Sequence, residues 1–401
     1  MPTPDGGTKV DSESLGTRNA KYLIPFVAGL VVYATAVGLF SVDLRAFETS
    51  AMRAILLDDS TGTVIFEKNA DDLMPPASMS KLMTAVMVFQ RLKDGSLAQD
   101  DTLPVSEKAW RMGGSKMFVE VGKRVSVRDL LRGIIVQSGN DATIVVAEGL
   151  SGDEDEFAEE MTQYSREIGL NDSVFKNASG WPSEGHVMTA RDLAVLARHT
   201  IREYPEYYPY YAERSFTFSG IEQRNRNPLL GTVAGVDGLK TGHTEEAGYG
   251  LTASAERNDR RLILVVAGLE SSKQRAKEAE RLLEHGFRNF ENYRLFGAGD
   301  SVIDAAVWLG ESGAVPLVIK NDLTLTLSRE ARRNMTVKVV YDSPVPAPIS
   351  QGDEIAKLVV DTGERFEIPL FAGADVQELT MFRRLRAAVN YLVWGPPVSA
   401  P

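Results

Sequence analysis

Hydrophobic and polar residues alternate in two different patterns along the chain, and the change from one pattern to the other divides the chain into two parts. Between about residues 50 and 295, short apolar runs that fit strands are mixed with longer segments whose apolar residues recur every three or four positions. From about Asp300, short apolar runs recur between Gly, Asp and Pro turns without helical spacing. The pattern predicts an α/β domain followed by a small all-β domain.

Within the first part, the expected strands form two hairpins. Apolar residues 54–57 and 63–66 flank a turn rich in Asp, Ser and Gly, and apolar residues 249–255 and 262–269 flank a second polar turn. Helical spacing is expected over residues 78–93, 127–136, 141–150, 190–201 and 273–289. Strands therefore lie at both ends of this part, with most of the helices between them.

The N-terminus carries a basic segment followed by an apolar one. Arg18 and Lys21 precede an uninterrupted apolar stretch from Tyr22 to about Val42. That order is typical of a secretory signal or a signal anchor, and the stretch is near the roughly 20 residues that span a bilayer. A buried core helix is the alternative, and it is disfavoured because the run is terminal and free of charge.

The last apolar segment, residues 381–394, predicts an amphipathic helix. Its apolar positions are Phe382, Leu385, Ala388, Val389, Leu392 and Val393, and Arg383, Arg384 and Arg386 cluster near its start. Basic amphipathic helices lie on anionic membrane surfaces. Packing against its own domain is the alternative, and the arginine cluster and terminal position favour membrane contact.

Composition excludes several functions. The 401 residues are too many for one ordinary core and agree with two domains plus end segments. A formal net charge of −11 argues against broad nucleic-acid binding, which needs basic surfaces. There is no cysteine, so disulfides, thiolate metal sites and a cysteine nucleophile are excluded. The four histidines lack the spacing of metal ligands, so no metal is expected.

Two tetrapeptides have the form Ser-x-x-Lys, which brings a hydroxyl and an amine to one face of a helix. Ser78 and Lys81 open an apolar helix after Pro75-Pro76, whereas Ser173 and Lys176 lie in a polar loop sequence. Apolar surroundings favour the neutral form of a lysine, which can then act as a base. We expect Ser78 to be a nucleophile activated by Lys81. Taken alone, the motif also fits a helix cap and a solvated lysine.

Two later motifs add to this chemistry. Ser138-Gly139-Asn140 lies between two expected helices and offers a hydroxyl for proton relay and an amide for substrate binding. Lys240-Thr241-Gly242 offers a cation for a carboxylate and a glycine that lets a substrate backbone approach a strand. Each alone also fits an ordinary turn. In this order, the three motifs are those of penicillin-binding proteins and class A β-lactamases.

From about Phe47 to Trp394 the chain resembles the low-molecular-mass penicillin-binding D-alanyl-D-alanine carboxypeptidases. The matching stretches are residues 77–84, 138–142, 225–227, 236–244 and 286–291. The resemblance implies a β-lactamase/transpeptidase-like α/β catalytic domain, with helices on an antiparallel sheet, then a small all-β domain and a C-terminal amphipathic helix. The expected boundaries are 1–46 for the tail and signal peptide or anchor, 47–296 for the catalytic domain, 297–380 for the β-rich domain and 381–401 for the membrane-associating helix and tail.

The resemblance also implies catalytic roles. Ser78 would attack the carbonyl between the two terminal D-alanines of a peptidoglycan stem pentapeptide, and Lys81 would accept its proton. Ser138 would help pass that proton to the leaving D-alanine, while Asn140 orients the acyl group and Lys81. Water then hydrolyses the acyl-enzyme. β-Lactams mimic the substrate and should acylate the same serine.

A second set of residues would bind the substrate. The implied members are Lys240, Thr241, Gly242, His243, Arg226 and Arg275. Lys240, Thr241 and Arg226 would hold the terminal carboxylate, and Arg275 matches another family arginine near the site. The backbone N–H groups of Ser78 and His243 would form the oxyanion hole. No metal or other cofactor is implied.

The resemblance also implies a cellular location and a set of partners. The resemblance implies a place on the periplasmic side of the bacterial inner membrane, with helix 381–394 on the outer surface of that membrane. The expected partners are peptidoglycan stem pentapeptides and β-lactam antibiotics, with no nucleic acid. The oligomeric state stays open, a homodimer included.

Three alternative functions stay open at this point. They are a β-lactamase, a D,D-endopeptidase that cuts cross-links, and a wall-binding protein with a decayed active site. The middle motif is Ser-Gly-Asn rather than Ser-Asp-Asn, which disfavours a β-lactamase. One departure from the family is Trp181-Pro182, where several relatives have Leu and Asp, and it leaves the deacylation rate open.

Overall fold

The structure, a computed structural model, describes residues 47–394. The apolar segment expected to be a signal or anchor, residues 22–42, lies outside this range. The described chain divides into a first unit, Phe47–Phe290, and a second unit that begins at Glu291.

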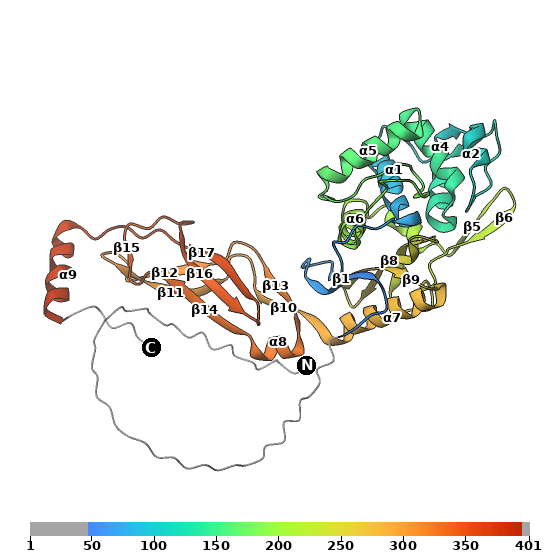
Figure 1. Ribbon diagram of the computed structural model, residues 1–401. Coiled ribbons are helices and arrows are strands. Elements are labelled where there is room, and N and C mark those ends of the chain that lie inside the picture. The colour runs from blue at the N-terminus through green and yellow to red at the C-terminus, as the bar shows by residue number, and fades with distance from the viewer. Residues whose placement is uncertain (1–46, 395–401) are drawn as a thin grey trace, which may run out of the picture. The chain divides into compact units, whose positions relative to one another are not determined.

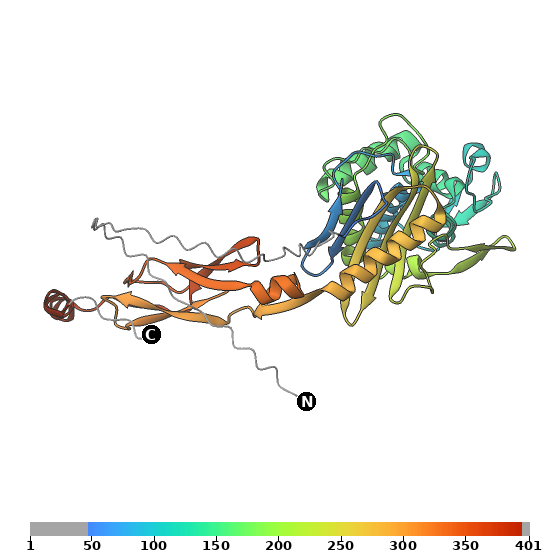
Figure 2. The same cartoon turned by 60° about the horizontal axis from the view of Figure 1, so that its bottom comes forward.

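A five-stranded antiparallel sheet forms the middle of the first unit (Figures 1 and 2), in the order β2-β1-β9-β8-β7. Its strands are β1 (Arg53–Asp58), β2 (Val64–Lys68), β7 (Val236–Thr244), β8 (Gly248–Arg257) and β9 (Arg260–Leu269). Both expected hairpins are confirmed as the pairs β1–β2 and β8–β9. Because β7 is the last strand of the order, its outer edge has no strand partner in this sheet.

Both faces of this sheet are buried, because alternate residues of a strand point to opposite faces. Ile55 and Val265 belong to the larger core on one face, which includes the apolar side of α1 (Lys81–Lys93). Leu56 and Leu264 belong to the core on the other face. Figure 2 shows α7 (Ser272–Asn289) running along that second face.

The remaining elements of the first unit are mostly helical. The α-helices are α2 (Glu107–Arg111), α3 (Val127–Arg132), α4 (Asn140–Ser151), α5 (Glu154–Glu167) and α6 (Ala190–Glu203). Two 3-10 turns are η1 (Ala77–Ser80) and η3 (Tyr208–Ala212), and one π-turn is η2 (Gly133–Gln137). Two small ribbons pair β3 (Thr102–Pro104) with β4 (Arg124–Ser126), and β5 (Ser215–Phe218) with β6 (Ile221–Arg224).

Two of the expected helices have a different backbone at one end. The helix expected over residues 78–93 begins with the 3-10 turn η1, and α1 itself begins at Lys81. Ala77 has a φ of 49°, which an α-helix cannot accommodate. The helix expected over residues 127–136 changes at Gly133 into the π-turn η2, which ends at Ser138 in the left-handed conformation. The turn η1 carries Ser78 of the Ser-x-x-Lys motif, and η2 leads directly into Ser138 of the Ser-x-Asn motif.

The second unit is β-rich, as expected. A six-stranded sheet has the order β14-β16-β17-β12-β11-β15, and β10 pairs with β13. These strands are β10 (Phe290–Phe296), β11 (Ser301–Trp308), β12 (Ala314–Val318), β13 (Leu323–Ser328), β14 (Thr336–Tyr341), β15 (Val345–Pro346), β16 (Glu354–Asp361) and β17 (Arg365–Ala372). One short helix, α8 (Arg329–Asn334), interrupts them. The unit has its own apolar core, which includes Leu317, Leu358 and Leu370.

The expected C-terminal helix is present as α9 (Met381–Trp394) (Figure 1). Along residues 47–394, none of the helices combines the length and the apolar content needed to cross a bilayer.

Candidate active site

The first-unit motifs meet around Ser78, which lies in the turn η1. Lys81 Nζ lies 2.8 Å from Ser78 Oγ, because one helical turn separates the two residues. The reading of Ser78 as a helix cap is wrong, since neither η1 nor α1 has a side-chain cap. Lys81 is only 1% exposed, so the reading of a solvated lysine is wrong as well.

Three oxygen atoms surround the amine of Lys81, and their hydrogen-bonding character determines whether the amine is neutral or protonated. Nζ lies 2.7 Å from Asn140 Oδ1 and 2.5 Å from the backbone oxygen of Ser179. Both of these oxygens can only accept. A neutral amine therefore uses its two N–H groups on them and turns its lone pair toward the Ser78 hydroxyl, which can donate. Burial and the charge of Arg226, against the opposing charge of Asp141, bring the pKa of Lys81 down to about 7.

Asn140 and Ser138 come from the η2–α4 junction. The Asn140 amide is held from both ends, because its Nδ2 donates to the oxygen of Gly113 at 2.9 Å while its Oδ1 accepts from Lys81. Ser138 is almost completely buried and lines the same pocket as Ser78. Within residues 47–394 its hydroxyl has no hydrogen bond, so it is available to a ligand in that pocket.

Asp141 is a supporting residue that the motif did not single out. Its carboxylate accepts hydrogen bonds from the backbone N–H groups of Met117, Phe118 and Val119, at 2.8–3.2 Å. The backbone oxygen of Ser115, in the same loop, accepts from Asn140 N. A buried acid after the Ser-x-Asn motif was the available signal for this role. Asp141 fixes the loop that forms one wall of the pocket.

Asn177 is a second residue missed from the sequence, and it organises the loop that includes Trp181. Its Oδ1 accepts from the N–H groups of Ser179, Gly180 and Trp181, and its Nδ2 donates to the oxygen of Trp181. Gly180 has a φ of 74°, and a Cβ there would lie 1.9 Å from the oxygen of Ala77. The loop therefore packs directly on the nucleophile turn and holds the Ser179 oxygen against Lys81.

The Lys-Thr-Gly motif lies on the edge strand β7, beside η1. A Cβ on Gly242 would lie 2.9 Å from the oxygen of Pro76 and 3.2 Å from the Cβ of Ala77. The glycine therefore serves the approach of β7 to the nucleophile turn. Gly242 also lines the pocket that contains Ser78, so the expectation that it makes room for a substrate backbone stays a prediction.

Two arginines line the pocket near Ser78, and the buried Lys240 lies close to them. The pocket has a volume of about 450 Å³, and its lining includes Ser138, Thr241, His243, Arg226 and Arg275. Lys240 is 2% exposed, and burial together with Lys81, Arg226 and Arg275 holds its pKa well below the ordinary value. Burial also lowers the pKa of Arg275, whose Nε has no hydrogen-bond partner within the described residues. Arg226, Lys240 and Arg275 have no ion pair within residues 47–394, and such cations around one pocket make a site for an anion such as a carboxylate.

The competing Ser-x-x-Lys serine has a structural contact. Ser173 is completely buried, and its hydroxyl donates to Asp192 Oδ2 at 2.6 Å. Lys176 lies apart from that hydroxyl bond, in a surface depression beside Trp181. The contacts of the two serines therefore agree with the preference for Ser78 that the local sequence context gave.

The comparisons with known proteins agree with this geometry. The sequence profile described as D-alanyl-D-alanine carboxypeptidase matches residues 41–271, and the profile described as penicillin-binding protein 5, C-terminal domain, matches residues 290–378. D-alanyl-D-alanine carboxypeptidase DacA of Haemophilus influenzae is 37% identical over 346 residues, which cover 84% of this chain and 88% of that protein.

Solved structures give the same assignment. The crystal structure of D-alanyl-D-alanine carboxypeptidase DacD from Francisella tularensis is similar with a TM-score of 0.75 at 31% identity, covering 86% of this chain and 99% of that one. Penicillin-binding protein D2 from Listeria monocytogenes, in its ampicillin-bound form, is similar with a TM-score of 0.56 at 33% identity, covering 61% and 99%. This chain therefore belongs to the D-alanyl-D-alanine carboxypeptidase family, and it is a serine peptidase.

Proposed function

We propose that this enzyme removes the terminal D-alanine from peptidoglycan stem pentapeptides through an acyl-enzyme on Ser78, and that the first unit carries the whole reaction. The observation that supports the proposal most is the position of Lys81 between Ser78 and two obligate acceptors. Beside it lies a pocket of unpaired cations that suits the carboxylate of a peptide C-terminus.

Acylation follows from these contacts. The Lys81 lone pair accepts the Ser78 proton as Oγ attacks the carbonyl carbon between the two alanines. The peptide lies along the free edge of β7, where backbone groups can pair with an added strand. The N–H groups of Ser78 and His243 stabilise the oxyanion, and Lys240, Thr241, Arg226 and Arg275 hold the terminal carboxylate.

Collapse of the tetrahedral intermediate releases D-alanine. The C–N bond breaks, and the leaving nitrogen takes up the proton that Lys81 received, by way of Ser138, which lies in the same pocket. Asn140 keeps Lys81 and the acyl group in place. Water then adds to the ester, with Lys81 again as base, and frees Ser78. One peptide and one water give one shortened peptide and one D-alanine.

A pentapeptide that ends in D-alanyl-D-alanine should lose one D-alanine per turnover, because the arginines that line the pocket together with Ser78 hold the terminal carboxylate one residue beyond the bond that is cut. Mass spectrometry of the products measures this loss.

Incubation with penicillin should leave one long-lived adduct per chain, because the ester on Ser78 is formed faster than water removes it. Peptide mapping should place that adduct on Ser78.

Other products would support the alternative functions. Rapid multiple-turnover hydrolysis of penicillin would indicate a β-lactamase. Cleavage of cross-linked muropeptide dimers without D-alanine release from pentapeptide would indicate a D,D-endopeptidase. Binding of muropeptides without any turnover would indicate a wall-binding protein.

We propose that α9 holds the enzyme on the outer surface of the inner membrane, at its periplasmic side. Met381 is 85% exposed and Phe382 88%, and Leu385 and Val389 are exposed too. Their spacing places these side chains on one side of the helix, beside the arginines at its start. This exposure disfavours the alternative that the helix packs on its own domain. An apolar face with flanking arginines suits an anionic lipid surface.

Replacing Phe382 and Leu385 together by glutamate should release the enzyme from anionic vesicles, because charged side chains cannot enter the acyl region. Binding to vesicles is measured by sedimentation at low and high salt. Repeating the comparison of parent and double variant in chains without residues 1–46 separates the contribution of the apolar N-terminal segment to vesicle binding. Equal sedimentation of parent and double variant in the shortened chains would contradict a role for α9. Turnover of a soluble peptide should be unchanged.

A further inference from the structure

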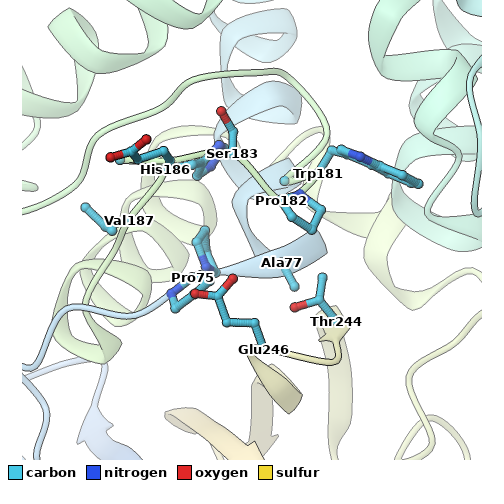
Figure 3. A pocket seen from close by; sticks show the side chains of 13 residues that line it. Pro75, Ala77, Trp181, Pro182, Ser183, His186, Val187, Thr244 and Glu246 are labelled. Carbon is cyan, nitrogen blue, oxygen red and sulfur yellow. The ribbon is translucent and has the colours of Figure 1, made fainter.

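A second pocket of about 500 Å³ opens on the other side of the nucleophile turn. We call it the acyl pocket. Its lining includes Ala77, which precedes Ser78, and Thr244, which follows His243. Figure 3 shows Ala77 and Thr244 on one side of the pocket and His186 and Val187 on the other. The acyl pocket therefore adjoins the residues to which we assign the reaction.

The direction of the substrate leads into this pocket. The terminal carboxylate belongs with Lys240 and Arg275, in the pocket that contains Ser78, Thr241 and Gly242. The acyl part of the peptide must leave Ser78 on the opposite side. Along the edge of β7, that direction leads from Gly242 to Thr244 and the turn after it.

The walls of the acyl pocket are apolar and acidic. Pro75, Pro182 and Val187 supply apolar surface, and Glu184 and Glu246 supply two carboxylates. In Figure 3 the carboxylate of Glu246 is directed toward Pro75. The lining contains no lysine or arginine, and neither glutamate has an ion pair or hydrogen-bond partner within residues 47–394.

Basic side chains gather instead in a neighbouring depression. Lys108, Arg111 and Lys176 line that depression, and Trp181 takes part in the lining of both hollows. Glu154 also lines this depression and pairs with Lys108 at 2.9 Å, so the depression holds charges of both signs with basic groups in excess. Among the residues that line the acyl pocket, only Glu184 and Glu246 carry a full charge, and Lys176 lies just outside it, with its Cε 3.5 Å from the place of a Cβ on Gly185.

We infer that the acyl pocket receives the side chain of the residue that precedes D-alanyl-D-alanine, and that Glu246 and Glu184 select a side chain ending in a free amine. An aliphatic stem fits the apolar walls, and an ammonium group at its end complements the two carboxylates. This specificity rests on the proposed carboxypeptidase function. It adds a recognition element upstream of the bond that is cut.

Three acetylated tripeptides test the inference, each with D-alanyl-D-alanine after a variable residue. That residue is L-lysine, Nε-acetyl-L-lysine or L-norleucine, so only the free amine distinguishes the first. The parent enzyme should hydrolyse the lysine peptide with a kcat/KM about two to five times that of the other two, the size expected for solvent-exposed ion pairs. The difference should lie mainly in KM and should shrink at high salt.

Glu246→Gln should bring the three peptides closer together, and a Glu184→Gln/Glu246→Gln double variant should make them equal. Glu245→Gln is the matched control, because Glu245 is exposed in the same β7–β8 turn but does not line the pocket. It should keep the parent's preference. The rate of acylation by benzylpenicillin, which carries no amine, should be the same in all variants and shows that the site is intact.

The outcomes separate the two proposals. If the parent hydrolyses none of the three peptides, the carboxypeptidase function itself fails. If it hydrolyses all three equally, the function stands and the amine selectivity is overturned. If Glu246→Gln slows all three peptides by the same factor, the carboxylate acts on the structure of the site, and the selectivity is again overturned.

Discussion

Replacing Ser78 by alanine should abolish both peptide turnover and the penicillin adduct. The nucleophile has no substitute, because within the described residues no other hydroxyl that lines the pocket has a hydrogen bond to Lys81; these hydroxyls belong to Ser115, Ser138, Thr241 and Tyr249. In serine proteases, loss of the nucleophile removes nearly all of the rate enhancement, so a fall of at least about 10⁴-fold is expected. D-alanine release and intact-mass analysis after penicillin treatment measure the two effects.

Ser173→Ala is the matched control for this variant. It also removes the serine of a Ser-x-x-Lys sequence, but one whose hydroxyl is bonded to Asp192. It should keep the adduct and the turnover while losing about 1 kcal/mol or more of stability, since the buried carboxylate loses a donor. Retention of the adduct in Ser78→Ala, or its loss in Ser173→Ala with the fold intact, would overturn the assignment of the nucleophile.

The sequence was most informative where chemistry depends on local spacing. Ser78 and Lys81 are one turn apart, so their contact could be predicted from helical geometry alone. The same holds for the two hairpins, because polar turns between apolar runs define them. The family motifs then predicted that Ser138, Asn140 and Lys240 would lie near this pair.

The supporting contacts could not be predicted, because they join distant parts of the chain. Lys81 meets Ser179 across 98 positions, and that contact depends on the loop that Asn177 organises. Asn and Gly in a polar stretch indicate only a turn, and many folds place such turns elsewhere. The irregular turns η1 and η2 were also missed, since apolar periodicity does not distinguish an α-helix from a tighter or wider turn.

The acidity of Lys81 sets a testable pH dependence. With a pKa of about 7, the amine is mostly protonated at pH 5 and mostly neutral at pH 9. A base must be neutral to accept the serine proton, so the rate of penicillin acylation should rise with pH, reach half of its plateau near the pKa of Lys81 and level off above about pH 8. Lys240 has to be charged to bind a carboxylate, and its lowered pKa predicts a falling limb at high pH. Stopped-flow acylation rates from pH 5 to 10 measure both limbs.

Lys81→Arg separates the base from the charge. Arginine keeps the donors for Asn140 and Ser179 but stays protonated throughout this range, so it cannot accept the proton of Ser78. Acylation should fall by about 10³-fold or more, and the rising limb near pH 7 should disappear. Lys176→Arg, at the other Ser-x-x-Lys sequence, should leave the profile unchanged. A rising limb that survives in Lys81→Arg would show that another group is the base. The contact between the Lys81 amine and the Ser78 hydroxyl would then not serve proton transfer.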